Sequence, residues 1–134
     1  MKINHTAMYV QDLEKAKAFY EKYFDAKSNE RYHNPKTGLQ TYFLSFGGES
    51  RLEIMTRPDV VERSICKTAD AQAVEYLGYT HLAFSTGSKE AVDKLTNQLR
   101  NDGYVVCGEP RTTGDGYYES CVLDVEGNRI EIVA

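Results

Sequence analysis

Two histidines and two glutamates recur in this chain in matching local settings. His5 stands in HTA and His81 in HLA, while Glu53 and Glu131 stand in RLEI and RIEI. The histidines are 76 residues apart and the glutamates 78, so both settings recur in the same order at nearly equal spacing. Two imidazoles and two carboxylates form a suitable nitrogen and oxygen shell for Zn²⁺, Ni²⁺, Co²⁺, Fe²⁺ or Mn²⁺. The four side chains therefore predict a divalent metal site.

The position of each glutamate within an apolar run supports this interpretation. An unpaired carboxylate inside an apolar core costs on the order of several kcal/mol, and coordination or a hydrogen-bonded partner removes that cost. A solvent-facing position, or an ion pair with Arg51 or Arg129, would explain each glutamate taken alone. The matched set of four favours the metal.

The elements that must position these residues form two similar series. In the first, residues 3–10 alternate in polarity as a strand does. Asp12 can cap the helix that follows. The apolar positions of that helix fall at spacings of three and four: Leu13, Ala16, Phe19, Tyr20 and Tyr23. Three strands are then predicted at 27–33, 39–46 and 51–55, with the turn-forming NPKTG between the first two. The pattern is βαβββ.

The second series repeats this plan. A strand is predicted at 79–86, and Ser88 can cap a helix whose apolar side chains share one face: Val92, Leu95 and Leu99. Gly103 supplies a C-cap for that helix. Strands then follow at 104–107, 117–124 and 128–133. The sequence thus predicts an α+β fold with two βαβββ modules in tandem.

Length and composition are compatible with this organisation. We expect a first module at 1–56, a linker at 57–78 and a second module at 79–134, making one structural domain overall. With 134 residues and a hydrophobic fraction of 41%, the chain has enough apolar residues for a core.

The same figures argue against several classes of function. A net charge of -4 does not favour binding to a nucleic-acid backbone. No apolar run approaches the length of a membrane span, and the N-terminus does not resemble a signal peptide.

The three cysteines form no CxxC pair, which predicts free thiols in a reducing cytoplasm. Cys107 and Cys121 are expected to pack as small hydrophobic side chains.

The chain resembles the vicinal-oxygen-chelate superfamily. The resemblance is carried by the βαβββ duplication and by three stretches: HTAMYVQDLEKAKAFY, THLAFS and VLDVEGNRIEIV. The superfamily includes glyoxalase I, fosfomycin-resistance thiol transferases, methylmalonyl-CoA epimerase, extradiol dioxygenases and bleomycin-binding proteins. It implies that the two modules form a pair of half-barrels around a central metal cleft. It also implies a homodimer, in which modules pair within a chain or are exchanged between chains.

The resemblance places His5, Glu53, His81 and Glu131 at the four metal-ligand positions of glyoxalase I. It implies one divalent metal per site, Zn or Ni in the first place, with Co, Fe and Mn as alternatives. The implied reaction is a lyase or isomerase reaction on a small substrate with neighbouring oxygens, such as the hemithioacetal of methylglyoxal with a thiol co-substrate. A proton would move through a metal-bound enediolate, with Glu131 as the main base and Glu53 as the second candidate.

Residues outside the four metal-ligand positions are compatible with more than one activity. Glutathione-using glyoxalase I carries an arginine four residues after the first histidine, where this chain has Tyr9. Tyr9, Arg111 and Tyr118 are candidates for contacts with substrate, although Arg111 could equally be a solvated loop arginine. The alternative functions are a thiol or group transferase of the fosfomycin-resistance type and a non-catalytic protein that binds a drug-like small molecule. The intact set of four ligands favours the enzyme over the binding protein.

Overall fold

The helices and strands follow one another in two successive series, seen in a computed structural model that describes residues 3–61 and 78–134. The first series is β1 (His5–Tyr9), α1 (Leu13–Phe24), β2 (Lys27–Ser28), β3 (Tyr32–His33), β4 (Gln40–Ser45) and β5 (Arg51–Thr56). The second is β6 (His81–Ser85), α2 (Lys89–Asn101), β7 (Val106–Thr112), β8 (Tyr118–Leu123) and β9 (Arg129–Val133). The chain divides into two compact units, Met1–Arg63 and Ser64–Ala134. Most of the predicted linker, 57–78, lies outside the described residues.

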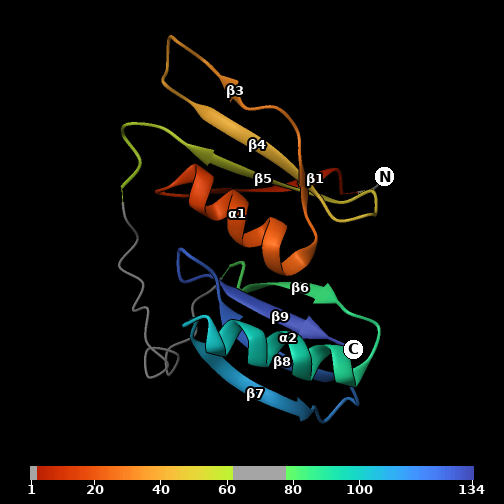
Figure 1. Ribbon diagram of the computed structural model, residues 1–134. Coiled ribbons are helices and arrows are strands. Elements are labelled where there is room, and N and C mark those ends of the chain that lie inside the picture. Colours follow the sequence, from red (N-terminus) through yellow and green to blue (C-terminus); the bar gives the residue numbers. More distant parts are fainter. Residues whose placement is uncertain (1–2, 62–77) are drawn as a thin grey trace. The chain divides into compact units, whose positions relative to one another are not determined.

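The first unit is a mixed sheet with one helix on it. The strands run in the order β1-β5-β4-β2, and β3 also pairs with β4. β1 and β5 are parallel, whereas β5, β2 and β3 each run antiparallel to β4. The run expected at 27–33 is therefore split into two short strands. Helix α1 crosses one face of this sheet (Figure 1).

Helix α1 forms where its cap and its apolar spacing predict it. The Asp12 side chain accepts a hydrogen bond from the backbone N–H of Lys15, as expected of an N-cap. All five apolar positions expected on its inner face are buried: Leu13, Ala16, Phe19, Tyr20 and Tyr23. The helix is thus fixed to the sheet by large aromatic side chains.

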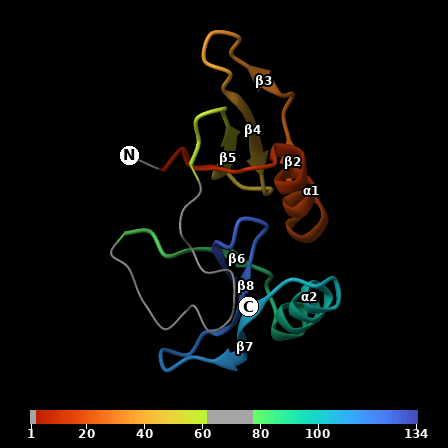
Figure 2. The ribbon, with the colours of Figure 1, turned by 90° about the vertical axis from the view of Figure 1, so that its left-hand side faces the viewer.

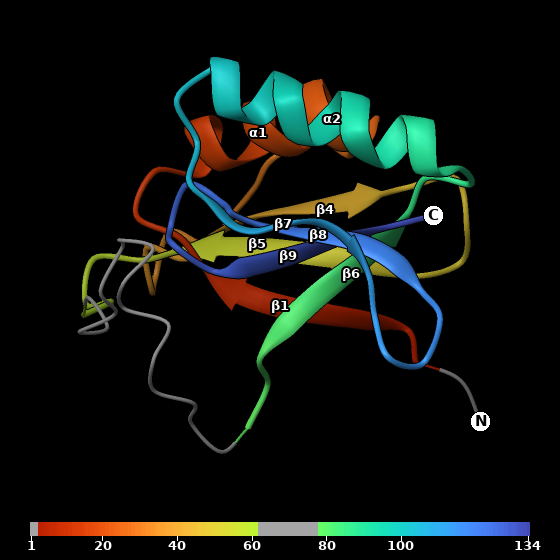
Figure 3. The ribbon, with the colours of Figure 1, turned by 90° about the horizontal axis from the view of Figure 1, so that it is seen from below.

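The second unit repeats the topology of the first. Its four strands run in the order β6-β9-β8-β7, with β6 and β9 parallel and the other neighbours antiparallel. Helix α2 lies along one face of this sheet (Figures 2 and 3). The predicted α+β fold of two βαβββ modules is confirmed, one module in each unit.

Polar side chains join α2 to its sheet where the sequence suggested only apolar ones. Val92 and Leu99 are fully buried as expected, but the fully buried residue between them is Thr96, whereas Leu95 is half-buried. Thr96 Oγ1 donates to the carbonyl of Val92 at 2.7 Å and lies 2.6 Å from Ser120 Oγ of β8, which is also fully buried. Since Thr96 has a single hydroxyl proton, Ser120 must be the donor in the second bond.

The last strand of each unit separates an apolar face from a polar one. Leu52 and Ile54 of β5 are buried, as are Ile130 and Ile132 of β9. Alternate residues of a strand point to opposite faces. The glutamate between each pair of core residues therefore faces away from the helix. No helix in the described part of the chain is long and apolar enough to cross a membrane.

Candidate metal and substrate site

The first unit brings His5 and Glu53 together on the open face of its sheet. In the parallel pairing of β1 and β5, His5 is opposite Arg51 and Ala7 is opposite Glu53. His5 Nε2 lies 3.7 Å from Glu53 Oε2. The Glu53 side chain is 17% exposed and that of His5 is 38% exposed, so both remain accessible. The small side chain of Ala7, opposite the glutamate, leaves room for the imidazole to reach across the strands.

Two neighbours fix the orientation of the His5 ring. His5 Nδ1 lies 2.9 Å from Asn4 Oδ1, and Arg51 Nη2 donates to the same oxygen at 2.6 Å. Because arginine is only a donor, the atom facing it must be the amide oxygen, and Nδ1 of His5 must then carry a proton. In the neutral ring the free lone pair is therefore on Nε2, the nitrogen that faces Glu53.

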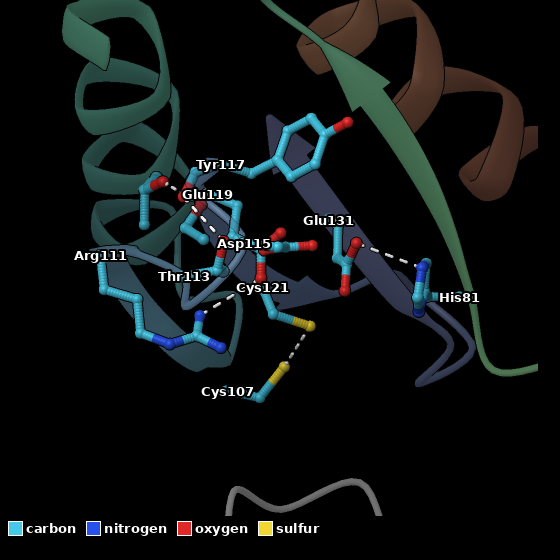
Figure 4. Close-up of polar contacts among 11 residues, drawn as sticks. His81, Cys107, Arg111, Thr113, Asp115, Tyr117, Glu119, Cys121 and Glu131 are labelled. Atoms are coloured by element: carbon cyan, nitrogen blue, oxygen red, sulfur yellow. Dashed lines mark hydrogen bonds and ion pairs between the residues drawn. The ribbon is translucent and has the colours of Figure 1, made fainter. Parts of the chain in front are cut away.

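The second unit repeats this arrangement with shorter distances. His81 is opposite Arg129 and Ala83 is opposite Glu131, the same register as in the first unit. His81 Nε2 lies 3.1 Å from Glu131 Oε2, and the two side chains point toward one another (Figure 4). His81 Nδ1 is 2.9 Å from Thr80 Oγ1, so here too the preceding residue holds the far side of the ring.

Each pair has the donor types of half a metal site. An imidazole nitrogen and a carboxylate oxygen at this separation suit a divalent ion, and a partner on Nδ1 is the usual support of a metal-binding histidine. Within residues 3–61 and 78–134, no three His, Cys, Asp or Glu side chains gather as a complete site. Each pair by itself therefore provides two of the four predicted ligands. Neither glutamate lies in the apolar core, so accessibility and a histidine partner already offset the cost expected for a buried carboxylate.

A depression of about 380 Å³ adjoins the pair in the second unit. It is lined by His81, Cys107, Gly108, Arg111, Glu119, Cys121, Arg129 and Glu131. Arg111 Nη1 lies 3.3 Å from Glu119 Oε1 at its edge, with both residues on the same side of the sheet as Glu131 (Figure 4). The structure thus brings the predicted Arg111 to the same depression as the predicted ligands His81 and Glu131.

Of the other two predicted substrate contacts, Tyr118 does not line this depression and Tyr9 belongs to the first unit. Tyr118 belongs to the opposite face of β8, and its hydroxyl donates to Asp93 Oδ1 of α2 at 2.7 Å. This contact raises the pKa of Tyr118. Tyr9 is two strand positions beyond Ala7 on β1 and is 45% exposed. Hydrogen bonds to Asp59 and to the Tyr9 hydroxyl raise the pKa of Arg57.

Two lining residues carry chemistry that the sequence did not reveal. Cys107 and Cys121 were expected to pack as small hydrophobes, and in the structure their Sγ atoms lie 3.1 Å apart. The contact with Cys107, together with burial, raises the pKa of the Cys121 thiol well above its usual range. The two cysteines are 14 residues apart on neighbouring strands, and no local motif signals their contact.

Comparison with known proteins gives a consistent set of similarities. A sequence profile described as the Glyoxalase/Bleomycin resistance protein/Dioxygenase superfamily matches residues 2–132. The protein YwkD of Bacillus subtilis (strain 168) is 31% identical over 101 residues, which cover 75% of this chain and 71% of YwkD.

Solved structures of glyoxalase I are similar in fold. For the enzyme of Zea mays the TM-score is 0.78 at 21% identity, covering 98% of this chain and 44% of the maize chain. For the trypanothione-dependent enzyme of Leishmania major it is 0.75 at 21% identity, covering 99% of this chain and 86% of that one. At these identities the likeness concerns the fold alone.

Proposed function

Because the chain belongs to the glyoxalase/bleomycin resistance protein/dioxygenase superfamily, we propose that it is a metal-dependent lyase or isomerase of the glyoxalase I type. One observation carries the proposal. Both units place a histidine Nε2 against a glutamate carboxylate, at 3.7 Å and 3.1 Å, in the same strand register. A duplicated pair of this kind provides four donors of the types that a catalytic divalent ion requires.

The residues that hold the ion in this proposal are His5, Glu53, His81 and Glu131. Zn²⁺ or Ni²⁺ suits this shell first, with Co²⁺, Fe²⁺ and Mn²⁺ as alternatives. Asn4 and Thr80 act on the histidines through Nδ1 and keep Nε2 directed at the site. When bound, the ion supplies Lewis acidity to two neighbouring oxygens of the substrate.

The proposed substrate class is a small compound with vicinal oxygens, of which the hemithioacetal of methylglyoxal with a thiol is the type. Glu131 removes the proton from the carbon that bears the hydroxyl and the sulfur, and returns it to the neighbouring carbonyl carbon. This transfer converts the hemithioacetal into a 2-hydroxy thioester without loss or gain of atoms. Glu53 is the second candidate for the base. The depression beside Glu131 and Arg111 is the proposed place of the substrate.

A turnover assay tests the reaction. Purified protein is loaded with Zn²⁺, Ni²⁺ or Co²⁺ and given methylglyoxal with a series of thiols, while formation of the thioester is followed. We expect turnover with at least one metal and one thiol, and a loss of roughly 10²–10⁴-fold in kcat/KM for Glu131→Gln. A parallel assay with fosfomycin and the same thiols separates proton transfer from thiol transfer.

Three results would contradict the proposal. Thiol addition to fosfomycin without thioester formation indicates a group transferase. Tight binding of a small molecule without turnover of either substrate indicates a sequestering protein. If the Glu53→Gln/Glu131→Gln variant forms the thioester at the wild-type rate, neither glutamate is the catalytic base.

A further inference from the structure

A pair of thiols faces the same depression as Glu131. Cys107 of β7 and Cys121 of β8 have their Sγ atoms 3.1 Å apart, and Figure 4 shows the two side chains directed at each other. Both residues are half-buried cysteines outside any disulfide and both line the depression, so a small reagent can reach them. Cys121 is the direct cross-strand partner of Glu131. The first unit has Phe43 at the matching place, opposite Glu53.

An irregularity in β7 produces this contact. Val106 is opposite Val122 and Gly108 is opposite Cys121, so β7 contains one extra residue at Cys107. A bulge of this kind changes the direction of a side chain without ending the strand. In regular pairing only one of the two residues, 107 or 108, would face Cys121. Here Gly108 is opposite Cys121 along the backbone while the side chain of Cys107 also lies against it.

Gly108 allows β7 to lie close to Cys121 because it has no side chain. A Cβ atom at position 108 would lie 3.1 Å from the Cβ of Cys121, closer than ordinary packing allows. β7 is an edge strand of its sheet, with β8 as its neighbour in the strand order. A small shift of an edge strand is enough to bring two sulfurs from this contact to bonding distance of about 2.05 Å.

We propose that Cys107 and Cys121 are a reversible oxidation site that forms an intramolecular disulfide at the edge of the depression. The proposed oxidant is a low-molecular-weight disulfide. The thiolate of one cysteine attacks a sulfur of that disulfide, which breaks the small S–S bond, releases one small thiol and leaves a mixed disulfide. The thiolate of the other cysteine attacks the protein sulfur of the mixed disulfide and releases the second small thiol.

The exchange is balanced in atoms and electrons. Two electrons pass from the cysteine sulfurs to the small disulfide, and the two cysteine protons end on the two released thiols. An excess of reduced small thiol reverses both steps. The new bond joins β7 to β8 next to Glu131, so the oxidation state of the pair alters the wall of the depression. The site does not depend on the reaction proposed above.

Peptide mapping of the intact native protein tests the assignment. Trypsin cleaves after Lys67, Arg63, Arg100, Arg111 and Arg129, which leaves the three cysteines in three different peptides: 64–67, 101–111 and 112–129. Folded protein is incubated with hydroxyethyl disulfide, remaining thiols are alkylated, and the digest is analysed by mass spectrometry without reduction. We expect 101–111 linked to 112–129 with the loss of two hydrogen masses, and separation of the two on addition of dithiothreitol.

Two controls make the result specific. Cys66→Ser should give the same linked peptides, because Cys66 takes no part. Wild-type protein unfolded in urea should give a mixture of the three possible pairings, because the selectivity comes from the fold. The proposal is overturned if the folded protein keeps all three thiols, links Cys66 to either cysteine, or stops at mixed disulfides on Cys107 or Cys121.

Discussion

The histidine and glutamate pairs give the sharpest expectations for single residues. His5→Ala and His81→Ala each remove one of two nitrogen donors, so each should weaken Zn²⁺ or Ni²⁺ binding by at least about a hundredfold. Metal content after dialysis and titration with a competing chelator measure this directly. His33→Ala is the matched control, because His33 is exposed on β3 and lies outside the proposed site. Equal metal affinity in wild type and His81→Ala would mean that His81 does not bind the metal.

Asn4 gives a more demanding test of the geometry around His5. Asn4→Leu removes the acceptor that orients Nδ1 and should weaken metal binding by about 10–100-fold. Asn4→Asp retains an acceptor oxygen at the same place and should restore the affinity. If both variants bind metal as the wild type does, the hydrogen bond at Nδ1 does not position His5. Far-UV circular dichroism of the two variants checks that neither has lost its fold.

Tyr9 bears on the identity of the thiol. A carboxylate-bearing thiol such as glutathione finds no arginine at this position, and the nearby Arg57 is already in an ion pair with Asp59. A lost charge-assisted contact of this kind costs about 1.5–3 kcal/mol, or one to two powers of ten in kcat/KM. We therefore expect poor use of glutathione hemithioacetal and about a 10–100-fold gain for Tyr9→Arg.

A comparison of thiols checks this expectation. The gain from Tyr9→Arg should be confined to anionic thiols, and Tyr9→Phe should not produce it. Efficient turnover with glutathione that Tyr9→Arg does not improve would show that the carboxylate is bound elsewhere. If Arg57→Ala or Arg111→Ala then removes that turnover, the residue concerned supplies the missing charge.

At the scale of the elements, the buried contact between α2 and β8 makes a prediction about stability. Thr96→Val leaves the buried Ser120 hydroxyl proton without its acceptor and should lower the free energy of unfolding by about 1–3 kcal/mol. Ser120→Ala removes the donor but leaves the bond from Thr96 to the Val92 carbonyl, so it should cost only about 1 kcal/mol. Urea denaturation of the two variants measures the difference.

The double variant Thr96→Val/Ser120→Ala removes both hydroxyls at once. Its loss of stability should be smaller than the sum of the two single losses, because no buried donor remains unsatisfied. A larger loss for Ser120→Ala than for Thr96→Val would mean that Ser120 is not the donor of this bond.

The elements differ in how far the sequence could predict them. Helix α1 follows from a capping aspartate and apolar spacing, which are local signals. The position of Thr96 in the core does not, because its hydroxyl oxygen accepts from Ser120, 24 residues away on β8. The irregular pairing of β7 cannot be predicted from the sequence either, because it depends on which backbone groups of β7 and β8 form hydrogen bonds. Without that register, neither the contact of Cys107 with Cys121 nor the position of Arg111 beside Glu119 can be derived.

At the scale of the whole molecule, the duplication was visible because both copies keep the same residues at the same strand positions. The matching register of the two parallel strand pairs explains why HxA and RxEI recur together: each alanine is opposite the glutamate to which the histidine reaches. The sequence therefore predicted a histidine and glutamate pair for each unit. The contacts of Tyr118 were less predictable, because the strand register decides to which face of β8 its side chain belongs. In the structure its hydroxyl contacts Asp93 of α2.

Assembly is the remaining property of the whole molecule. We expect a homodimer, since closed two-fold assemblies are the commonest way for identical chains to associate. Sedimentation or light scattering at micromolar concentration should give twice the mass of 15.2 kDa. A mass of one chain under these conditions would contradict the prediction.

Paired variants determine which chains share a metal. One chain carries His5→Ala/Glu53→Gln, the other His81→Ala/Glu131→Gln, and each alone should bind no metal. The two are co-expressed with different affinity tags, and dimers that contain one of each are purified. If units of different chains join, one site of each mixed dimer has four native ligands, and about half of the wild-type metal content returns. If both units of one chain form the site, each site keeps two altered ligands and no metal returns, while the dimeric mass is unchanged.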